Sequence, residues 1–155
     1  MINGGILTIA LLLPNLIWIL LPSPTPAINP EGHGSRTLKV MAIFERIGQA
    51  GSFIIPFFYN FSVHSVMEAA FLGLLLAAFG LYIACWARYF THQRRQAWLY
   101  HNLGRLPLPM SILPVICFLC AAVVMHSLFL AAAASILGIG HIYMSRYEYS
   151  FLPEK

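Results

Sequence analysis

The chain has 155 residues, of which 59% are hydrophobic and 9% are charged, and its net charge is +4 at pH 7. Soluble domains carry about a quarter charged residues, so this composition excludes a separate soluble domain. The basic residues lie beside apolar segments rather than on a polar face, which argues against nucleic acid as a partner. We therefore expect one all-α integral membrane domain that covers residues 1–155.

Five apolar stretches follow one another along the chain, and each is long enough, with its interfacial residues, to span hydrocarbon of about 20 helical residues. They cover 3–22, 39–61, 64–90, 109–126 and 128–147. The first lacks a basic leader and a small-residue cleavage site, so it is predicted to be a retained span. The connector 22–38 is rich in Pro and Gly, which indicates an irregular loop. The chain reverses tightly at His126–Ser127, which predicts a hairpin of the last two helices.

The basic residues are segregated along the chain. All nine fall at the connectors after the first, third and fifth stretches: Arg36, Lys39, Arg46, Arg88, Arg94, Arg95, Arg105, Arg146 and Lys155. Positive residues mark the cytoplasmic side, so the pattern predicts five spans with the N-terminus outside and the C-terminus inside a plasma or bacterial inner membrane. Anionic lipids of the cytoplasmic leaflet are the expected partners. A four-span alternative, with 38–61 re-entrant, breaks this segregation.

Small and polar residues recur at helical spacing in four of the stretches. These faces are Gly4, Thr8, Leu11, Asn15 and Trp18; Glu45, Gly48, Ser52, Ile55 and Tyr59; Gly73, Ala77, Gly80 and Ala84; and Ala131, Ala134, Gly138, His141 and Ser145. Small residues let membrane helices approach closely, so we expect the last two faces to pack against other helices. Pro56 removes a backbone donor and predicts a kink in the second stretch.

Six polar side chains on four stretches share one depth, in the cytoplasmic third: Asn15, Glu45, Arg46, Gln49, Arg88 and His141. Charged groups inside a membrane usually pair or line a cavity. We therefore expect a pocket open to the cytoplasm, in which Glu45 pairs with Arg88 or Arg46. Glu45 and His141 are the candidates for a general base or acid. The alternative stays open that Glu45 and Arg46 are only interfacial and that His141 bonds a neighbouring helix.

The third connector suits an anion. Its four arginines, with Lys39 nearby, have the chemistry to hold a phosphate or pyrophosphate, and they are Arg88, Arg94, Arg95 and Arg105. The alternative is that they serve only as the positive-inside anchor. We expect no metal site, because no HxxxH or HExxH motif occurs, and no cofactor is specified. A Ser–His–Asp triad is excluded because the chain has no Asp. Glu68 is expected to be interfacial, and His64 and His126 to be turn residues without partners.

Four segments resemble landmarks of small multi-pass bacterial membrane proteins of undetermined function. They are Phe44-Glu45-Arg46-Ile47-Gly48, Cys85-Trp86-Ala87-Arg88-Tyr89-Phe90, Leu106-Pro107-Leu108-Pro109-Met110 and Gly138-Ile139-Gly140-His141-Ile142-Tyr143. The layout is also similar to that of the isoprenylcysteine carboxyl methyltransferases, five-span bundles with a basic segment before a terminal hairpin. That family has Arg-His-Pro-x-Tyr before the hairpin and an acidic pair after it. Here 104–107 lacks the His and Tyr of the S-adenosylmethionine enzymes, and 146–149 has one acid.

Three functions stay open from the sequence. The first is binding of a lipid or isoprenoid-type ligand in the cytoplasm-facing pocket, or action as an accessory subunit of a partner membrane protein. The second is a small membrane transferase, of methyltransferase type, that acts on a lipid head group. The third is a transporter or channel built from a homo-oligomer, which is disfavoured because the outer half holds few polar residues. The sequence does not decide whether the protein is an enzyme.

Overall fold

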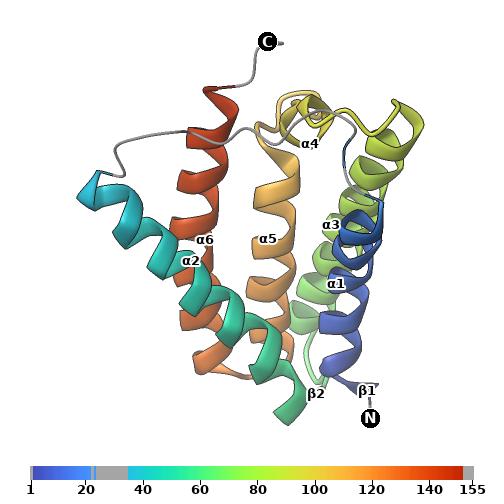
Figure 1. Ribbon diagram of the computed structural model, residues 1–155. Coiled ribbons are helices and arrows are strands. Elements are labelled where there is room, and N and C mark those ends of the chain that lie inside the picture. The colour runs from blue at the N-terminus through green and yellow to red at the C-terminus, as the bar shows by residue number, and fades with distance from the viewer. Residues whose placement is uncertain (1, 22, 24–34, 152–155) are drawn as a thin grey trace.

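The computed structural model describes residues 2–21, 23 and 35–151, and these residues form an all-α fold. Helices make up 78% of them, in six α-helices (Figure 1). The α-helices are α1 (Gly5–Leu20), α2 (Arg36–Ile54), α3 (Val66–Thr91), α4 (Ala97–Tyr100), α5 (Pro109–Val124) and α6 (Leu128–Tyr149). A 3-10 helix, η1 (Ile55–Phe58), continues α2, and two short strands, β1 (Ile2–Asn3) and β2 (Asn60–Phe61), pair antiparallel.

The helices run alternately up and down, with α5 between α3 and α6 (Figure 1). One end of the bundle, the α4 end, holds α4, the last turns of α1, α3 and α6, and the first turns of α2 and α5. The opposite end, the β1–β2 end, holds the two strands and the α5–α6 reversal. Every Lys and Arg that the structure describes lies in the half of the bundle nearer to the α4 end. Lys155 falls outside the described residues.

The predicted stretches correspond to these helices with two differences. The second stretch is not one kinked helix over 39–61, because the α-helix ends at Ile54 and gives way to η1. Pro56 stands in the first turn of η1, where a missing backbone N–H is tolerated. The second difference is the short helix α4, which lies in the third connector and has no counterpart among the five stretches. The reversal at His126–Ser127 is present, with His126 in a left-handed conformation at φ 52°.

Two helices, α3 with 26 residues and α6 with 22, are long and apolar enough to cross a membrane by length and composition. The apolar helices α1 and α5 have 16 residues each and fall short of that length. Two such helices give weak support for a membrane protein.

The tightest helix contact in the bundle joins α2 to α6 through glycines. A Cβ atom placed on Gly48 would strike the backbone of Leu137, and one placed on Gly140 would strike the backbone of Glu45. These two glycines therefore set how closely the two helices approach. They also fix the register of the pair, and that register sets Glu45 against the next turn of α6.

The two small-residue faces behave differently from each other. The predicted α6 face packs inward, with Ala134, Gly138 and Ser145 all buried. The predicted packing of the α3 face is wrong: Gly73, Ala77, Gly80 and Ala84 are exposed, and nothing lies within 4 Å of a Cβ placed on Gly73 or Gly80. The helix instead turns its larger side chains toward α5, because burying Leu75, Tyr82 and Tyr89 removes more apolar area from solvent.

The glycine contact gives a direct test of the fold. We expect Gly48→Ala and Gly140→Ala each to lower the free energy of unfolding by about 1–3 kcal/mol, because the added methyl group meets backbone that must move. The matched control is Gly73→Ala, in an exposed helical position, which should raise stability by about 0.5–1 kcal/mol. Thermal unfolding of the three variants in one detergent makes the comparison. Equal effects at all three positions would contradict the packing described here.

Candidate functional site

A cavity lies at the α4 end of the bundle, and each of the six described α-helices contributes to its wall. Its volume is about 350 Å³, which falls within the range of small-molecule sites. We call it the polar cavity. Its polar lining includes Asn15, Glu45, Tyr82, Tyr100, His141 and Glu148. Three of the residues predicted from the sequence, one each on α1, α2 and α6, are thus brought together, as the shared depth of these side chains indicated.

The central contact of the polar cavity joins Glu45 of α2 to His141 of α6. Nδ1 of His141 lies 2.6 Å from Oε1 of Glu45, and the two side chains are 27% and 21% exposed. The predicted pairing of Glu45 with Arg88 or Arg46 is therefore wrong. The reason is the close approach of α2 and α6, which places the carboxylate of Glu45 next to the imidazole of His141 and not next to either arginine. A carboxylate held against an imidazole is an arrangement that can accept or donate a proton.

A second contact joins α1 to α3. The side-chain amide of Asn15 donates to the hydroxyl of Tyr82 at 3.0 Å and to the carbonyl of Leu11 at 3.0 Å. The Tyr82 hydroxyl in turn donates to the same carbonyl of Leu11 at 3.4 Å. This arrangement satisfies polar groups that would otherwise be unpaired between apolar helices. Asn15 is therefore part of the wall of the cavity and also a link between two helices.

A third contact holds α4 to the end of α6. The hydroxyl of Tyr100 donates to Oε2 of Glu148 at 2.6 Å. Burial, and then the Glu148 carboxylate, raise the pKa of Tyr100 well above its ordinary value of 10.0, so the phenol keeps its proton. Tyr100 and Glu148 were not among the sequence candidates. The sequence does indicate that Tyr100 and Glu148 lie at the same end of the bundle. Their pairing, however, depends on the fold of the third connector.

A second cavity, of about 280 Å³, adjoins the polar cavity. The two share part of their wall, including Asn15, Tyr82 and His141. The rest of this adjoining cavity is mainly apolar, and its lining includes Leu11, Leu12, Ile19, Phe53, Phe118 and Leu137. Gln49, a sequence candidate, lines it as well. Polar and apolar volumes therefore meet at the level of His141.

Trp86 was also missed by the sequence reasoning, although it lines the polar cavity. Its side chain stacks on Phe90 and makes edge contacts with Tyr82 and Tyr89. The residue is 5% exposed, and its indole N–H has no hydrogen-bond partner within the described part of the chain. A buried donor without an acceptor is costly, so a group that supplies an oxygen here would be stabilised.

The arginines predicted as ligand-binding do not line either cavity. The guanidinium of Arg88 lies over the ring of Trp98, 4.9 Å from its centroid, in a cation–π contact. Arg46, Arg95 and Arg105 are exposed, and Arg94 is half-buried outside both linings. The structure therefore separates the arginines from the cavity, and the predicted phosphate-binding group of the third connector is not assembled around it.

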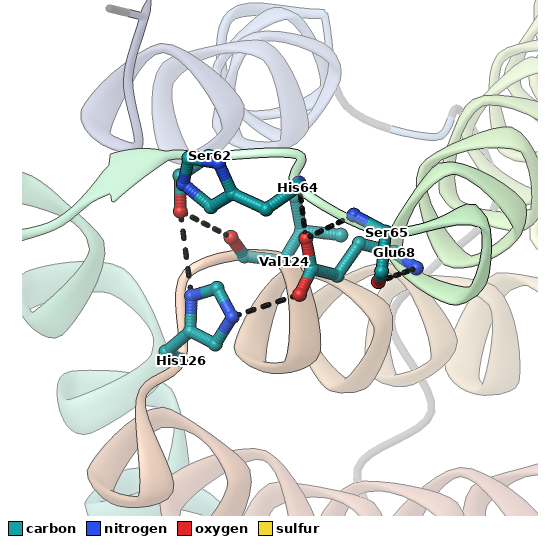
Figure 2. A network of polar contacts seen from close by, with 6 residues as sticks. All are labelled: Ser62, His64, Ser65, Glu68, Val124 and His126. Atoms are coloured by element: carbon teal, nitrogen blue, oxygen red, sulfur yellow. Dashed lines mark hydrogen bonds and ion pairs between the residues drawn. The ribbon is translucent and has the colours of Figure 1, made fainter.

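A second polar cluster lies at the β1–β2 end (Figure 2). Its central contact joins His126 to Glu68, which are 58 residues apart in the sequence. Nε2 of His126 lies 3.0 Å from Oε1 of Glu68, and Nδ1 of His126 lies 3.3 Å from the Ser62 hydroxyl. Oε2 of Glu68 accepts the backbone N–H groups of His64 and Ser65. The expectation that His126 has no partner is therefore wrong. Glu68 is 9% exposed, so it is buried within the protein.

This second cluster is accounted for by structure alone. Ser65 and Glu68 form a capping box that satisfies the first backbone donors of α3. The remaining carboxylate oxygen of Glu68 reaches His126 in the α5–α6 reversal, so the loop before α3 is tied to that reversal. Ser62 reinforces the tie, since its N–H donates to the carbonyl of Val124 at 3.2 Å.

Within residues 2–21, 23 and 35–151, no three His, Cys, Asp or Glu side chains come together as a possible metal site. The cysteines Cys85, Cys117 and Cys120 are all free and buried. Comparison of the chain with protein-family models, with curated protein sequences and with solved structures finds no match.

The Tyr100–Glu148 contact makes stability depend on alkaline pH. An unfolded tyrosine loses its proton near its ordinary pKa of 10.0, while folded Tyr100 retains it. The contribution of this group is therefore complete below pH 10 and is lost as the pH rises through the raised pKa. We expect Tyr100→Phe to lower the free energy of unfolding by about 1–3 kcal/mol at neutral pH. We also expect the stability of this variant to fall less steeply than that of the unmodified protein as the pH rises above 10.

The measurement is the unfolding temperature in one detergent between about pH 8 and pH 11. Tyr143→Phe is the matched control, because Tyr143 is 41% exposed on α6 and should leave the profile unchanged. An identical alkaline decline in Tyr100→Phe and in the unmodified protein would refute the assignment.

Proposed function

We propose that this chain is a five-span membrane protein, with the N-terminus outside and the basic α4 end in the cytoplasm of a cell with a plasma or inner membrane. The exposed apolar surface supports this proposal. Leu20, Val66, Leu128 and Phe129 are between 73% and 89% exposed, on three different helices or their ends. Soluble monomers rarely expose apolar patches larger than a few hundred Å². The basic residues gathered at one end supply the orientation.

Cysteine labelling tests this topology. His64 and Arg95 are exposed at opposite ends of the bundle, and the three native cysteines are buried. A membrane-impermeant maleimide should label His64→Cys on intact spheroplasts and Arg95→Cys only on inverted vesicles. If Arg95→Cys is labelled from outside and His64→Cys is not, the proposed orientation is reversed. If both are labelled from the same side, α3 does not cross the membrane and the proposal of five spans fails.

The function that the site supports best is the binding of an amphipathic ligand, of lipid or isoprenoid type, taken from the cytoplasmic leaflet. The single observation that carries this proposal is the junction of the polar cavity with the apolar adjoining cavity at Asn15, Tyr82 and His141. A ligand with a polar head and a hydrocarbon tail matches both volumes at once. Small-molecule sites commonly combine a mainly apolar wall with a few convergent polar groups.

Filling the cavity tests ligand binding. Ser145 is buried in the wall of the polar cavity, whereas Ser135 lies exposed on the same helix. We expect Ser145→Leu to lose most of the lipid that co-purifies with the protein, as measured by extraction and mass spectrometry, because the added volume occupies the site. Ser135→Leu is the matched control and should retain it. If Ser145→Leu folds and keeps the same bound lipid as the control, the binding proposal fails.

A second function, a small transferase of the methyltransferase type acting on a lipid head group, is favoured by one observation. His141 and Glu45 are in contact at 2.6 Å on the cavity wall, where a proton could be passed to a bound head group. The two functions are separable, because an enzyme would convert the bound lipid into a product, whereas a binding protein would release it unchanged.

A further inference from the structure

We propose that the head of the ligand is a cationic amine that also carries an oxygen acceptor, as in a long-chain amino alcohol. This inference rests on the proposed ligand-binding function and narrows its chemistry. The sequence predicts a phosphate, whereas the carboxylates that line the polar cavity favour a cation.

Two carboxylates line the polar cavity, those of Glu45 and Glu148, and among the described residues neither Lys nor Arg does. Oε1 of Glu45 is held by His141, and Oε2 of Glu148 accepts from Tyr100. The other oxygen of each carboxylate makes no hydrogen bond to the described residues. Two negatively charged acceptors are therefore open to a ligand, and an ammonium group has the charge and the donors to bind them.

The aromatic residues of the cavity favour the same ligand. Trp18, Tyr82, Trp86 and Tyr100 all contribute to its wall. Aromatic rings attract ammonium groups through their quadrupoles, and sites for amine ligands are often built from several such rings beside a carboxylate. Arg88 has its own ring partner in Trp98 and does not belong to the lining. An anionic head would meet two carboxylates, of which only Glu45 has a basic partner, His141.

The unpaired indole of Trp86 supplies an independent requirement. Trp86 lines the cavity, and its N–H is buried with no acceptor among the described residues, so a ligand that brings an oxygen close to its charged nitrogen would satisfy this donor. An amino alcohol satisfies both demands, since its ammonium faces the carboxylates and its hydroxyl oxygen accepts from the indole. The hydrocarbon tail then lies along Leu12, Ile19 and Phe53 in the adjoining cavity.

The experiment compares four C18 amphiphiles of one tail length on the full chain in phosphatidylcholine nanodiscs, with binding read by native mass spectrometry. The probes are sphinganine, octadecylamine, octadecanol and octadecyl phosphate. We expect sphinganine to bind at least about tenfold more tightly than octadecyl phosphate, because charge complementarity and cation–π contacts act together. Glu45→Gln with Glu148→Gln should remove this preference. The matched control is Glu68→Gln, which alters the buried acid at the opposite end of the bundle.

A further variant separates the two recognition elements. Trp86→Phe should weaken sphinganine about fivefold more than it weakens octadecylamine, as expected for one lost hydrogen bond. If octadecyl phosphate or octadecanol binds best and Ser145→Leu abolishes that binding, the amine proposal is overturned while the ligand-binding function stands. If no probe is displaced by Ser145→Leu, the binding function itself fails. If Glu68→Gln removes the preference as fully as the cavity variants, the site is not the polar cavity.

Discussion

The close contact of α2 with α6 is the constraint on which the rest of the site depends. Gly48 and Gly140 leave no room for a side chain between the two backbones, so the helices can meet in one register only. That register places Glu45 beside His141 on the wall of the polar cavity. A membrane offers no hydrophobic force to bring helices together, so such backbone contact is a principal source of their specificity. The chemistry of the cavity thus follows from two residues that have no side chain.

Much of the architecture was predictable because it depends on periodicity and length. Apolar stretches and turn residues located the main helices, and the small α6 face was correctly placed inside. The α3 face was not, although it has the same spacing. Spacing identifies a face, but the direction of that face depends on competition with the opposite one, where Leu75, Tyr82 and Tyr89 provide more area to bury.

The site was predictable in depth but not in pairing. Asn15, Glu45 and His141 were expected at one level because their distances from the helix ends agree, and level follows from chain position. Which groups touch at that level depends on interhelical distance and rotation, and neither is encoded in a single helix. For that reason Glu45 was assigned to an arginine and His126 was given no partner, while Tyr100 and Glu148, joined only through the fold of α4, were overlooked.

The hydrogen bond between Tyr100 and Glu148 has a consequence for ligand exchange. It fixes α4 at one end of the bundle, where this short helix forms part of the wall of the polar cavity. Under the proposed ligand-binding function, an amphipathic molecule would exchange more readily sideways, with its tail remaining among lipids, than by crossing into the aqueous phase. Occupancy of such a site responds to the mole fraction of the ligand in the leaflet rather than to its concentration in solution. The protein would in that case sample the composition of the membrane that surrounds it.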